Sequence, residues 1–401
     1  MNILVWLGNK GMHPAIYPNM KSIADALAAM GHKVITCDTA NGEEVVAAIS
    51  LLRDEKMIDL SIGANALGMK IIVDDGAPVN VFENLDTWHI SILLDEPFNP
   101  ACNGFSHVAK HHLITYLDRS DKEYFSRMQA AEGKYKLFMP LGGTSSGHSL
   151  SEMLECKRKS RYNVVFSAGK FAIYQEWPNW GEYGATPAMI NVLDDVLYLL
   201  QQKPVSVTEA AKEVLSARSM AEDVYFCAVA AFFPLMLCYI KAWRRRKLLD
   251  ELLSGGIAVD IFGEDWEEGD FSGGVNLHGK VPYAEMLKVI TEAKVMANDE
   301  ACFNNGAHDR VFTSMLGGAV VVSEYSSYLA EEFTDGQDLF MFDWQHIREQ
   351  LQIIPRLLQD DAYREDIACN AYGKVINRHT WYQRAQQLLE AVELLDFQRK
   401  L

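Results

Sequence analysis

The segment KVMANDEACFNNGAHDRVFTSMLGGAVVVS, residues 294–323, decides the fold. It opens and closes with short apolar runs at 295–297 and 319–322, which indicate strands. Between them, a polar loop at 298–306 precedes a run at 307–316 whose apolar residues recur at helical spacing. Two glycines follow, and residues without a Cβ end helices easily because they adopt left-handed backbone. The segment therefore predicts a β-loop-α-β unit and an α/β fold.

Polar and small residues cluster in the loop and the first turn of this predicted helix: Asn304, Asn305, Gly306, His308 and Arg310. A helix N-terminus has backbone N–H groups without intrahelical partners and a partial positive charge, so it binds phosphate groups well. An arginine one turn into the helix can add a bidentate grip. The pattern predicts a phosphate-binding loop; the alternative is an ordinary α/β crossover with a polar connection.

The N-terminal part of the chain predicts a doubly wound domain, in which ligands lie at the carboxyl ends of the strands. A strand at 2–7 is followed by a turn, Gly8, Asn9, Lys10 and Gly11, then by a helix at 18–30 and a strand at 32–36. Further strands are predicted at 57–61, 70–74, 89–94 and 137–140. Candidate catalytic groups at strand ends and in the first loop are Asp95, Glu96, Asp75 and His13. The alternative for each acidic residue is a helix cap or a turn.

A linker rich in Gly, Ser and Thr at 141–151 precedes a second domain, in which the strand pattern restarts at residue 163. Gly169 and Lys170 lie just past that strand, residues 186–253 are helical in pattern, and a further strand is predicted at 257–262. The string GVNLHGK at 274–280 resembles a P-loop, but Val281 replaces the hydroxyl residue that such a loop needs. It predicts instead a glycine turn before a helix at 283–293.

Two other features invite a functional interpretation. His107, His111 and His112 are predicted on a helix at a spacing that could bind a metal, but no glutamate completes H-E-x-x-H, so a solvated or interface role is favoured. The uncharged run at 224–240 is followed by the basic residues 244–247. It is shorter than the roughly 20 residues of a membrane span. A buried helix pair or a homodimer face is predicted, and a membrane-surface contact through 224–247 is the alternative.

The composition narrows the class of protein. The 401 residues are 49% hydrophobic and 23% charged, which suits a globular chain of two domains. With 37 basic and 54 acidic residues the net charge is −17, so no nucleic-acid partner is expected. The seven cysteines form no C-x-x-C pair, which predicts free thiols in a reducing compartment. The N-terminal apolar run is too short for a signal peptide, so a cytoplasmic location is expected.

The C-terminal third resembles the glycosyltransferases of the spore-maturation type. The carrying motifs are HGKV at 278–281, G-x-H-x-R-V-F at 306–312, GGAVVVS at 317–323 and H-T-W-x-x-R at 379–384, in that order. The resemblance covers about residues 257–389, weakens over 71–124 and is faint between them. It implies the GT-B architecture, with two facing Rossmann-like domains: an acceptor domain at 1–145, a nucleotide-sugar domain at 155–380 with a helical insertion at 186–253, and a crossover helix at 381–401.

The resemblance also implies roles for residues. The donor would be a nucleotide sugar, most simply a UDP-sugar, transferred as a hexosyl or related group to a glycan, protein or small-molecule acceptor. His278, Gly279, Lys280 and Val281 would lie near the base. Residues 304–310 would hold the diphosphate, and Thr313 would lie near the ribose. Turn residues 8–11 and 169–170 complete the expected nucleotide-sugar site.

One departure from the family and one absence bear on the chemistry. Many retaining relatives have two glutamates eight residues apart, where this chain has Asn305 and Thr313, so a retaining or an inverting outcome stays open. The chain has no Asp-x-Asp pair to bind a divalent metal, so no metal or cofactor is expected and the leaving group would be stabilised by helix dipole and cationic side chains. The alternatives are a nucleotide-sugar epimerase and a non-catalytic sugar- or nucleotide-binding protein of the same fold.

Overall fold

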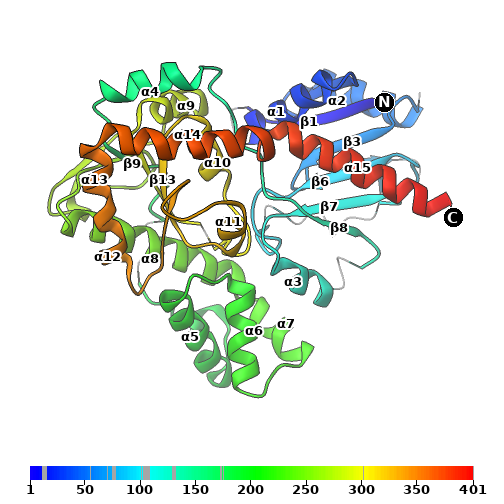
Figure 1. Ribbon diagram of the computed structural model, residues 1–401. Helices are drawn as coiled ribbons and strands as arrows, with labels where there is room; N and C mark the ends of the chain where they lie inside the picture. The colour runs from blue at the N-terminus through cyan, green and yellow to red at the C-terminus, as the bar shows by residue number, and fades with distance from the viewer. Residues whose placement is uncertain are drawn as a thin grey trace. The chain divides into compact units, whose positions relative to one another are not determined.

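The computed structural model describes residues 1–10, 16–54, 56–69, 71–74, 78–100, 102, 109–128, 132–171, 174, 176–300 and 302–400. The chain forms two compact units (Figure 1). Unit 1 contains Met1–Thr144 and His379–Leu401, and unit 2 contains Ser145–Arg378. Each unit is built on one six-stranded sheet with helices, so the predicted fold class, α/β with two Rossmann-like domains, is confirmed.

The sheet of unit 1 is parallel throughout, in the order β2-β1-β3-β6-β7-β8. Its strands are β1 (Asn2–Gly8), β2 (Lys33–Asp38), β3 (Leu60–Ala64), β6 (Trp88–Ile92), β7 (His112–Tyr116) and β8 (Tyr135–Phe138). This is the flavodoxin-like order, in which the direction of winding reverses between β1 and β3. The middle strands are buried over their whole length, because helices cover a doubly wound sheet on both faces.

The helices of unit 1 are α1 (Ile16–Ala29), α2 (Gly42–Ile49), the π-helical turn η1 (Ser50–Asp54), α3 (Asp121–Arg127) and α15 (Trp381–Lys400). The last helix packs against α1 (Figure 1). Trp88 Nε1 donates a hydrogen bond to Asp396 Oδ1 at 2.7 Å, and Gln387 Nε2 donates to the carbonyl of Phe138 at 3.1 Å. Packing against α1 and side-chain hydrogen bonds therefore both hold the C-terminal helix on unit 1.

The strand predicted at 70–74 is confirmed at β4 (Ile72–Asp74), but β4 pairs antiparallel with β5 (Pro78–Asn80) in a separate hairpin and not with the main sheet. The helix predicted around the histidines is wrong for His112, which begins strand β7, whose residues HLITY are all buried. His112 Nε2 lies 2.9 Å from Ser91 Oγ, and His107 is outside the described residues. His111 lies in a bend directly before the strand, so neither His111 nor His112 is on a helix.

The sheet of unit 2 is also parallel, in the order β11-β10-β9-β12-β13-β14. Its strands are β9 (Val164–Phe166), β10 (Val259–Ile261), β11 (Val275–Leu277), β12 (Val295–Asn298), β13 (Val320–Glu324) and β14 (Phe340–Phe342). This is the Rossmann order, which reverses between β9 and β12. Strand β11 was not predicted, and the predicted glycine turn at His278 and Gly279 follows it directly.

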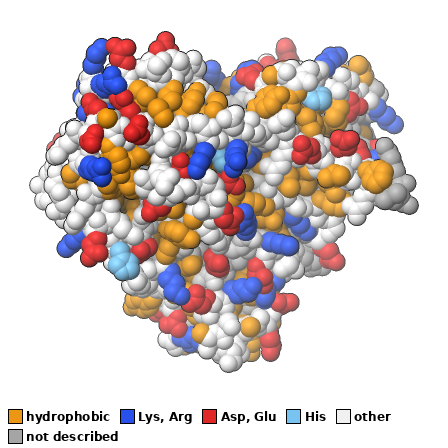
Figure 2. Space-filling model, in the orientation of Figure 1, with side chains coloured by type: hydrophobic (Ala, Val, Ile, Leu, Met, Phe, Trp, Pro, Cys, Tyr) orange, Lys and Arg blue, Asp and Glu red, His pale blue; other side chains and the backbone are white. Residues whose placement is uncertain are grey.

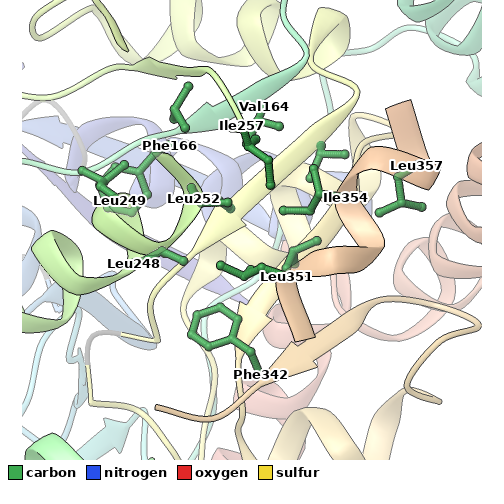
Figure 3. Close-up of a cluster of buried hydrophobic side chains, with 14 of the residues drawn as sticks. Val164, Phe166, Leu248, Leu249, Leu252, Ile257, Phe342, Leu351, Ile354 and Leu357 are labelled. Atoms are coloured by element: carbon green, nitrogen blue, oxygen red, sulfur yellow. The ribbon is translucent and has the colours of Figure 1, made fainter. Parts of the chain in front are cut away.

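The helices of unit 2 are α4 (Leu150–Arg158), α5 (Pro187–Gln202), α6 (Val207–Ala217), α7 (Asp223–Ala230), α8 (Phe233–Ser254), α9 (Tyr283–Glu292), α10 (Asp309–Leu316), α11 (Ser327–Glu332), α12 (Ile347–Gln350), α13 (Ile354–Gln359) and α14 (Asp361–Arg378), with short helical turns η5 (Trp180–Tyr183), η6 (Glu268–Asp270) and η7 (Leu351–Ile353). Figure 3 shows how the core forms: side chains of β9, α8 and the η7–α13 segment meet on one face of the sheet. Their burial fixes α8 against the strands.

The uncharged run at 224–240 is divided between α7 and α8, and Pro234 lies in the first turn of α8, where its missing N–H costs nothing. Phe226, Phe233 and Ile240 are buried, but Val224 is 67% exposed, so α7 is only partly core. Within the described part of the chain, no single helix is long and apolar enough to cross a membrane; α7 and α8 pass that test only together, across a 58° bend.

The basic residues after this run do not form a surface patch. Arg244 is fully buried and Arg245 is 7% exposed, because both face carboxylates inside unit 2. Only Arg246 and Lys247 of the four reach the surface, and each pairs with an acidic residue one turn along α8. In Figure 2 acidic and basic side chains are interspersed over the visible face. The basic residues at 244–247 therefore pair within the fold, while a homodimer face or a membrane-surface contact through 224–247 stays a prediction.

Candidate functional site in unit 2

The site lies where the winding of the second sheet reverses. Ligands of open α/β sheets bind at the carboxyl ends of the strands at such a switch point. In unit 2 the two strands concerned are β9 and β12. The chain leaves β9 through Ser167 and Gly169, and it leaves β12 through the loop that leads to α10. The segment that decided the fold therefore also provides one side of the switch point.

Helix α10 begins one to two residues later than predicted, with His308 as its N-cap. His308 Nδ1 accepts a hydrogen bond from the backbone N–H of Arg310 at 3.2 Å, which satisfies one of the N–H groups of the first turn. The remaining N–H groups of this turn and the helix dipole give the position a partial positive charge. At the other end Gly318 has φ +72°, so only a residue without a Cβ ends the helix without strain.

The Arg310 side chain bridges the switch point. One terminal nitrogen donates to the carbonyl of Ser167 at 2.6 Å, the other to the carbonyl of Asp299 at 3.3 Å, and Nε donates to His308 Nδ1 at 3.3 Å. The guanidinium also lies 3.5 Å from the Asp299 carboxylate. Arg310 thus ties the segment after β9 to the segment after β12, and its side chain remains 16% exposed.

Asp299 joins two arginines. It is fully buried, 3.3 Å from Arg245 Nε and 3.5 Å from Arg310. Burial acts to raise the pKa of Asp299, but the two guanidinium charges outweigh it and hold the pKa of this carboxyl below its usual range. Arg245 in addition donates to the carbonyl of Gly169 at 2.8 Å. The site therefore contains two cationic side chains, Arg245 and Arg310, and the ionised carboxylate of Asp299. Together they connect the segment after β9 with the segment after β12.

A second buried carboxylate, Glu300, connects the two ends of the loop. It accepts hydrogen bonds from Asn298 Nδ2 at 2.7 Å, from Ser323 Oγ at 2.9 Å and from the backbone N–H of His308 at 2.8 Å. Burial raises the pKa of Glu300 to about 8, and the nearby Glu324 carboxylate adds to that rise. Its own N–H donates to Glu324 at 3.2 Å.

The third carboxylate, Glu324 at the end of β13, is paired with Arg244 at 2.8 Å, with both side chains fully buried. It also accepts from Asn304 Nδ2 at 3.0 Å and from Trp344 Nε1 at 2.8 Å. Arg244 donates in turn to the carbonyls of residues 200, 203 and 205, at the end of α5. This pair fastens the helical insertion to the loop before α10.

The other loop residues predicted for the site are engaged within the protein. Asn304 is buried between Arg244 and Glu324. Asn305 Nδ2 donates to Glu209 at 2.6 Å, and the carbonyl of Gly306 accepts from Ser326 Oγ at 2.5 Å. Thr313 is buried on α10. Of the predicted residues in this segment, His308 and Arg310 are the partly exposed ones at the helix N-terminus.

The remaining predicted residues of unit 2 lie at the same sheet edge. Lys170 Nζ pairs with Asp270 at 2.5 Å. His278 follows β11, stacks on Phe262 with 4.3 Å between ring centroids, and bonds to Asp260 at 2.8 Å. Gly279, Lys280 and Val281 continue from it, with Gly279 at φ +66° and Lys280 paired to Glu264. Because β11 is separated from β9 by β10, this group lies beside the switch point and does not contact Arg310.

In unit 1, the residues after β1 and β6 occupy the corresponding sheet edge. Gly8 has φ +79° at the end of β1, and Asn9 and Lys10 follow it. Asp95 is half-buried and Glu96 is 3% exposed in the loop after β6. Gly11, His13 and Asp75 are outside the described residues.

Sequence reasoning missed the charged residues that build the site from inside: Arg244, Arg245, Asp299, Glu300 and Glu324. A usable signal existed for two of them. Asp299 and Glu300 directly follow a buried strand, where an acidic pair needs partners. The two arginines showed no such signal, because their carboxylate partners are far away in the sequence.

Comparisons with known proteins agree with this description. Residues 244–390, from the buried Arg244 through the switch-point loop to α15, match the protein family described as glycosyl transferase-like. No curated protein sequence matches the chain significantly. The family match does not distinguish the spore-maturation type, which stays a prediction.

Three solved structures illustrate the likeness of fold, each over 98% of this chain. Sucrose-phosphate synthase from Thermosynechococcus elongatus has a TM-score of 0.55 at 10% identity, over 99% of its own length. AviGT4, a glycosyltransferase involved in avilamycin A biosynthesis, has a TM-score of 0.52 at 12% identity, over 98% of its length. Anabaena HepE, solved with UDP and glucose, has a TM-score of 0.50 at 13% identity, over 98% of its length. The chain therefore has the two-domain α/β fold of GT-B glycosyltransferase structures, with a glycosyl transferase-like segment that runs from α8 of unit 2 into α15 of unit 1.

Proposed function

We propose that the protein is a glycosyltransferase that binds a nucleotide sugar, with a UDP-sugar as the first donor to test, at the switch point of unit 2. The observation that carries this proposal is the position of Arg310 and the N-terminus of α10 at the carboxyl edge between β9 and β12. The family match over residues 244–390 includes this segment, and HepE, of similar fold, was solved with UDP and with UDP-glucose.

The diphosphate would lie on the first turn of α10. Three of the five N–H donors of Arg310 reach acceptors among the described residues, and the guanidinium also lies 3.5 Å from the Asp299 carboxylate. Its side chain remains 16% exposed, so we expect a phosphate oxygen to reach it. As the glycosidic bond breaks, negative charge grows on the leaving phosphate oxygen. The fixed dipole and guanidinium stabilise that charge without reorganising. In this proposal the leaving group needs no metal ion.

The acceptor hydroxyl must lose a proton if the transfer inverts the anomeric centre. We assign this role to the loop after β6, with Asp95 before Glu96, because Asp95 is the more exposed of the two. Replacing a general base by its amide should lower turnover by about 10²–10⁴-fold while donor binding persists. Near-normal turnover in both Asp95→Asn and Glu96→Gln would remove this loop from the mechanism.

The proposal is tested by donor binding followed by turnover. Thermal-shift measurements with UDP and other nucleoside diphosphates should identify the base by the increase in Tm that a ligand of the folded state produces. Turnover of the matching nucleotide sugars is then followed with candidate hydroxyl acceptors. Acceptor-dependent release of the nucleoside diphosphate supports transfer, whereas isomerised donor without release would show an epimerase. Binding without either reaction would show a non-catalytic protein.

A further inference from the structure

The loop between β12 and α10 is closed by a single buried side chain. Glu300 stands two residues after β12, and the backbone N–H that it accepts belongs to His308, the N-cap of α10. The loop therefore begins and ends on the same carboxyl group. Its other two hydrogen bonds, from Asn298 Nδ2 and Ser323 Oγ, attach that carboxyl to the ends of β12 and β13.

This arrangement fixes the two groups that face the anion. His308 is held at its backbone by Glu300. Its Nδ1 lies 3.2 Å from the backbone N of Arg310, 3.3 Å from Arg310 Nε and 2.6 Å from Asp309 Oδ1. Displacing the His308 backbone would therefore move the Arg310 side chain and the first turn of α10 together. No other side chain among the described residues bonds the backbone N–H of His308.

We propose that Glu300 is a positioning residue that clamps the ends of the β12–α10 loop together and so holds His308 and Arg310 in place for a phosphate group. The ligand class rests on the proposed function; the clamp itself rests on the hydrogen bonds of Glu300. Glu300 is fully buried, so it acts on a ligand through His308 and Arg310 and not by contact.

The charge of the clamp should influence the affinity of the site. The groups that surround Glu300 are Glu324 at the end of β13, Arg310 and His308 at the start of α10, and Arg244 of α8, which pairs with Glu324. With a pKa near 8, Glu300 is mostly neutral at pH 7 and mostly ionised at pH 9. A bound diphosphate disfavours the ionised carboxyl, so binding is coupled to proton uptake and affinity should fall as the pH rises through 8.

The test compares Glu300→Gln and Glu300→Ala with the wild type and with Glu251→Gln, a buried carboxylate of the same unit that pairs with Lys247 and Arg348 away from the loop. The probe is UDP, measured by isothermal titration calorimetry between pH 7 and pH 9. Its terminal phosphate stays ionised in this range, because the second pKa of a phosphate monoester is about 6. Amide hydrogen exchange of residues 302–310 is measured on the same preparations without ligand.

Four results are expected. The affinity of the wild type for UDP should fall about three- to tenfold from pH 7 to pH 9, because the ionised Glu300 carboxylate repels the diphosphate. Glu300→Gln keeps an acceptor for the His308 N–H and cannot ionise, so it should match the wild type at pH 7 and lose this fall. Glu300→Ala should bind UDP at least about tenfold more weakly at every pH and exchange faster across 302–310, because the His308 N–H loses its partner. Glu251→Gln should follow the wild-type pH profile.

Other outcomes would contradict either the positioning role of Glu300 or the proposed binding of a nucleotide sugar. If Glu300→Ala leaves exchange of the loop unchanged, Glu300 does not position the site. If Glu300→Gln keeps the wild-type pH profile, the charge of Glu300 does not act on the ligand, and that part of the inference is refuted. A lower Tm in the variants with unchanged UDP affinity shows a structural role only, and should Glu300→Ala fail to fold, the pH profile of Glu300→Gln decides. If the wild type binds no nucleoside diphosphate, the proposed function and the positioning role fail together, while loop exchange still reports whether the clamp exists.

Discussion

The sheets of the two units differ in the polar groups that lie on and beside their strands. In unit 1 the buried polar side chains on the central strands are uncharged, and the buried carboxyl groups of Glu96, Asp118 and Asp121 lie after β6 and β7. Trp6 Nε1 on β1 donates to Ser61 Oγ on β3 at 2.9 Å, and that hydroxyl lies 3.0 Å from His89 Nδ1 on β6. In unit 2 buried charges of opposite sign are paired at the carboxyl edge: Arg244 with Glu324, and Asp299 between two arginines.

Neutral buried groups and buried charges have different energetic costs, and this difference suggests different roles for them. A row of neutral groups that satisfy one another costs little to bury, and it fixes how adjacent strands align. Removing full charges from water costs far more free energy, and the attraction between the paired charges often only offsets that cost. Such charges are retained where they perform a task, and in unit 2 they converge on the switch point at which α/β sheets bind ligands. In unit 2, the pairing of buried charges at the strand ends thus distinguishes the proposed site from the neutral rows inside the sheets.

The largest expected effect is at the Arg244–Glu324 pair. Arg244→Met leaves a buried carboxylate without its cation and three carbonyls of residues 200–205 without a donor. The free energy of unfolding should fall by about 3–5 kcal/mol, as for other broken buried pairs. Urea unfolding, with hydrogen exchange in β13 as the local readout, measures it. A loss below about 1 kcal/mol, the size of a surface pair, would mean that burial does not set the cost of these charges.

The next effect concerns activity. Arg310→Ala removes the guanidinium that would stabilise the negative charge growing on the leaving group. We therefore expect kcat to fall by about 10²–10³-fold, as when one oxyanion donor is lost. Arg310→Lys should recover only part, since a point charge cannot form the two parallel bonds of a guanidinium. Turnover and Tm are measured on one preparation. If Tm falls while UDP affinity stays unchanged, Arg310 only braces Asp299 and the segment after β9, and its phosphate role is refuted.

Unit 1 should respond to pH through His89. Burial lowers the pKa of His89 to about 3, and Ser61 occupies its Nδ1, so protonation is disfavoured twice. An unfolded histidine titrates near 6.5, so this group destabilises unit 1 by about 1.4 kcal/mol per pH unit below pH 6.5, and not above it. Hydrogen exchange of β3 and β6 at pH 7, 6 and 5 should show this slope in the wild type and not in His89→Gln. Parallel curves for the two proteins would contradict it.

The sequence predicted most of the fold because apolar strands and glycine turns are local signals. The two-unit architecture, β1, β12, β13 and the helix at 309–316 all follow from such signals. Strand β7 was missed because the histidines at its start suggested a helix. Strand β4 was predicted, but not its pairing in a hairpin, because nothing local distinguishes a hairpin strand from a sheet strand. The N-terminus of α10 was predictable, but its internal support was not. Glu300 and Arg244 are charged residues, which are normally on the surface, and their partners are distant in the sequence.

The smallest effect is expected at Arg246, which the sequence does not distinguish from Arg244. Its side chain is 35% exposed, and it bonds both carboxylate oxygens of Asp250 at 2.9 Å, one turn along α8. An exposed pair of this kind contributes only about 0.3–0.5 kcal/mol, because water screens it and two mobile side chains must be ordered. The guanidinium also lies 5.2 Å from the Phe271 ring, a contact that methionine partly replaces. Arg246→Met should therefore lower the free energy of unfolding by less than about 1 kcal/mol and leave UDP affinity unchanged. Urea unfolding beside Arg244→Met is the measurement. Equal losses in the two variants would show that the basic run acts as one surface, and the contrast between buried and exposed charge in α8 would be wrong.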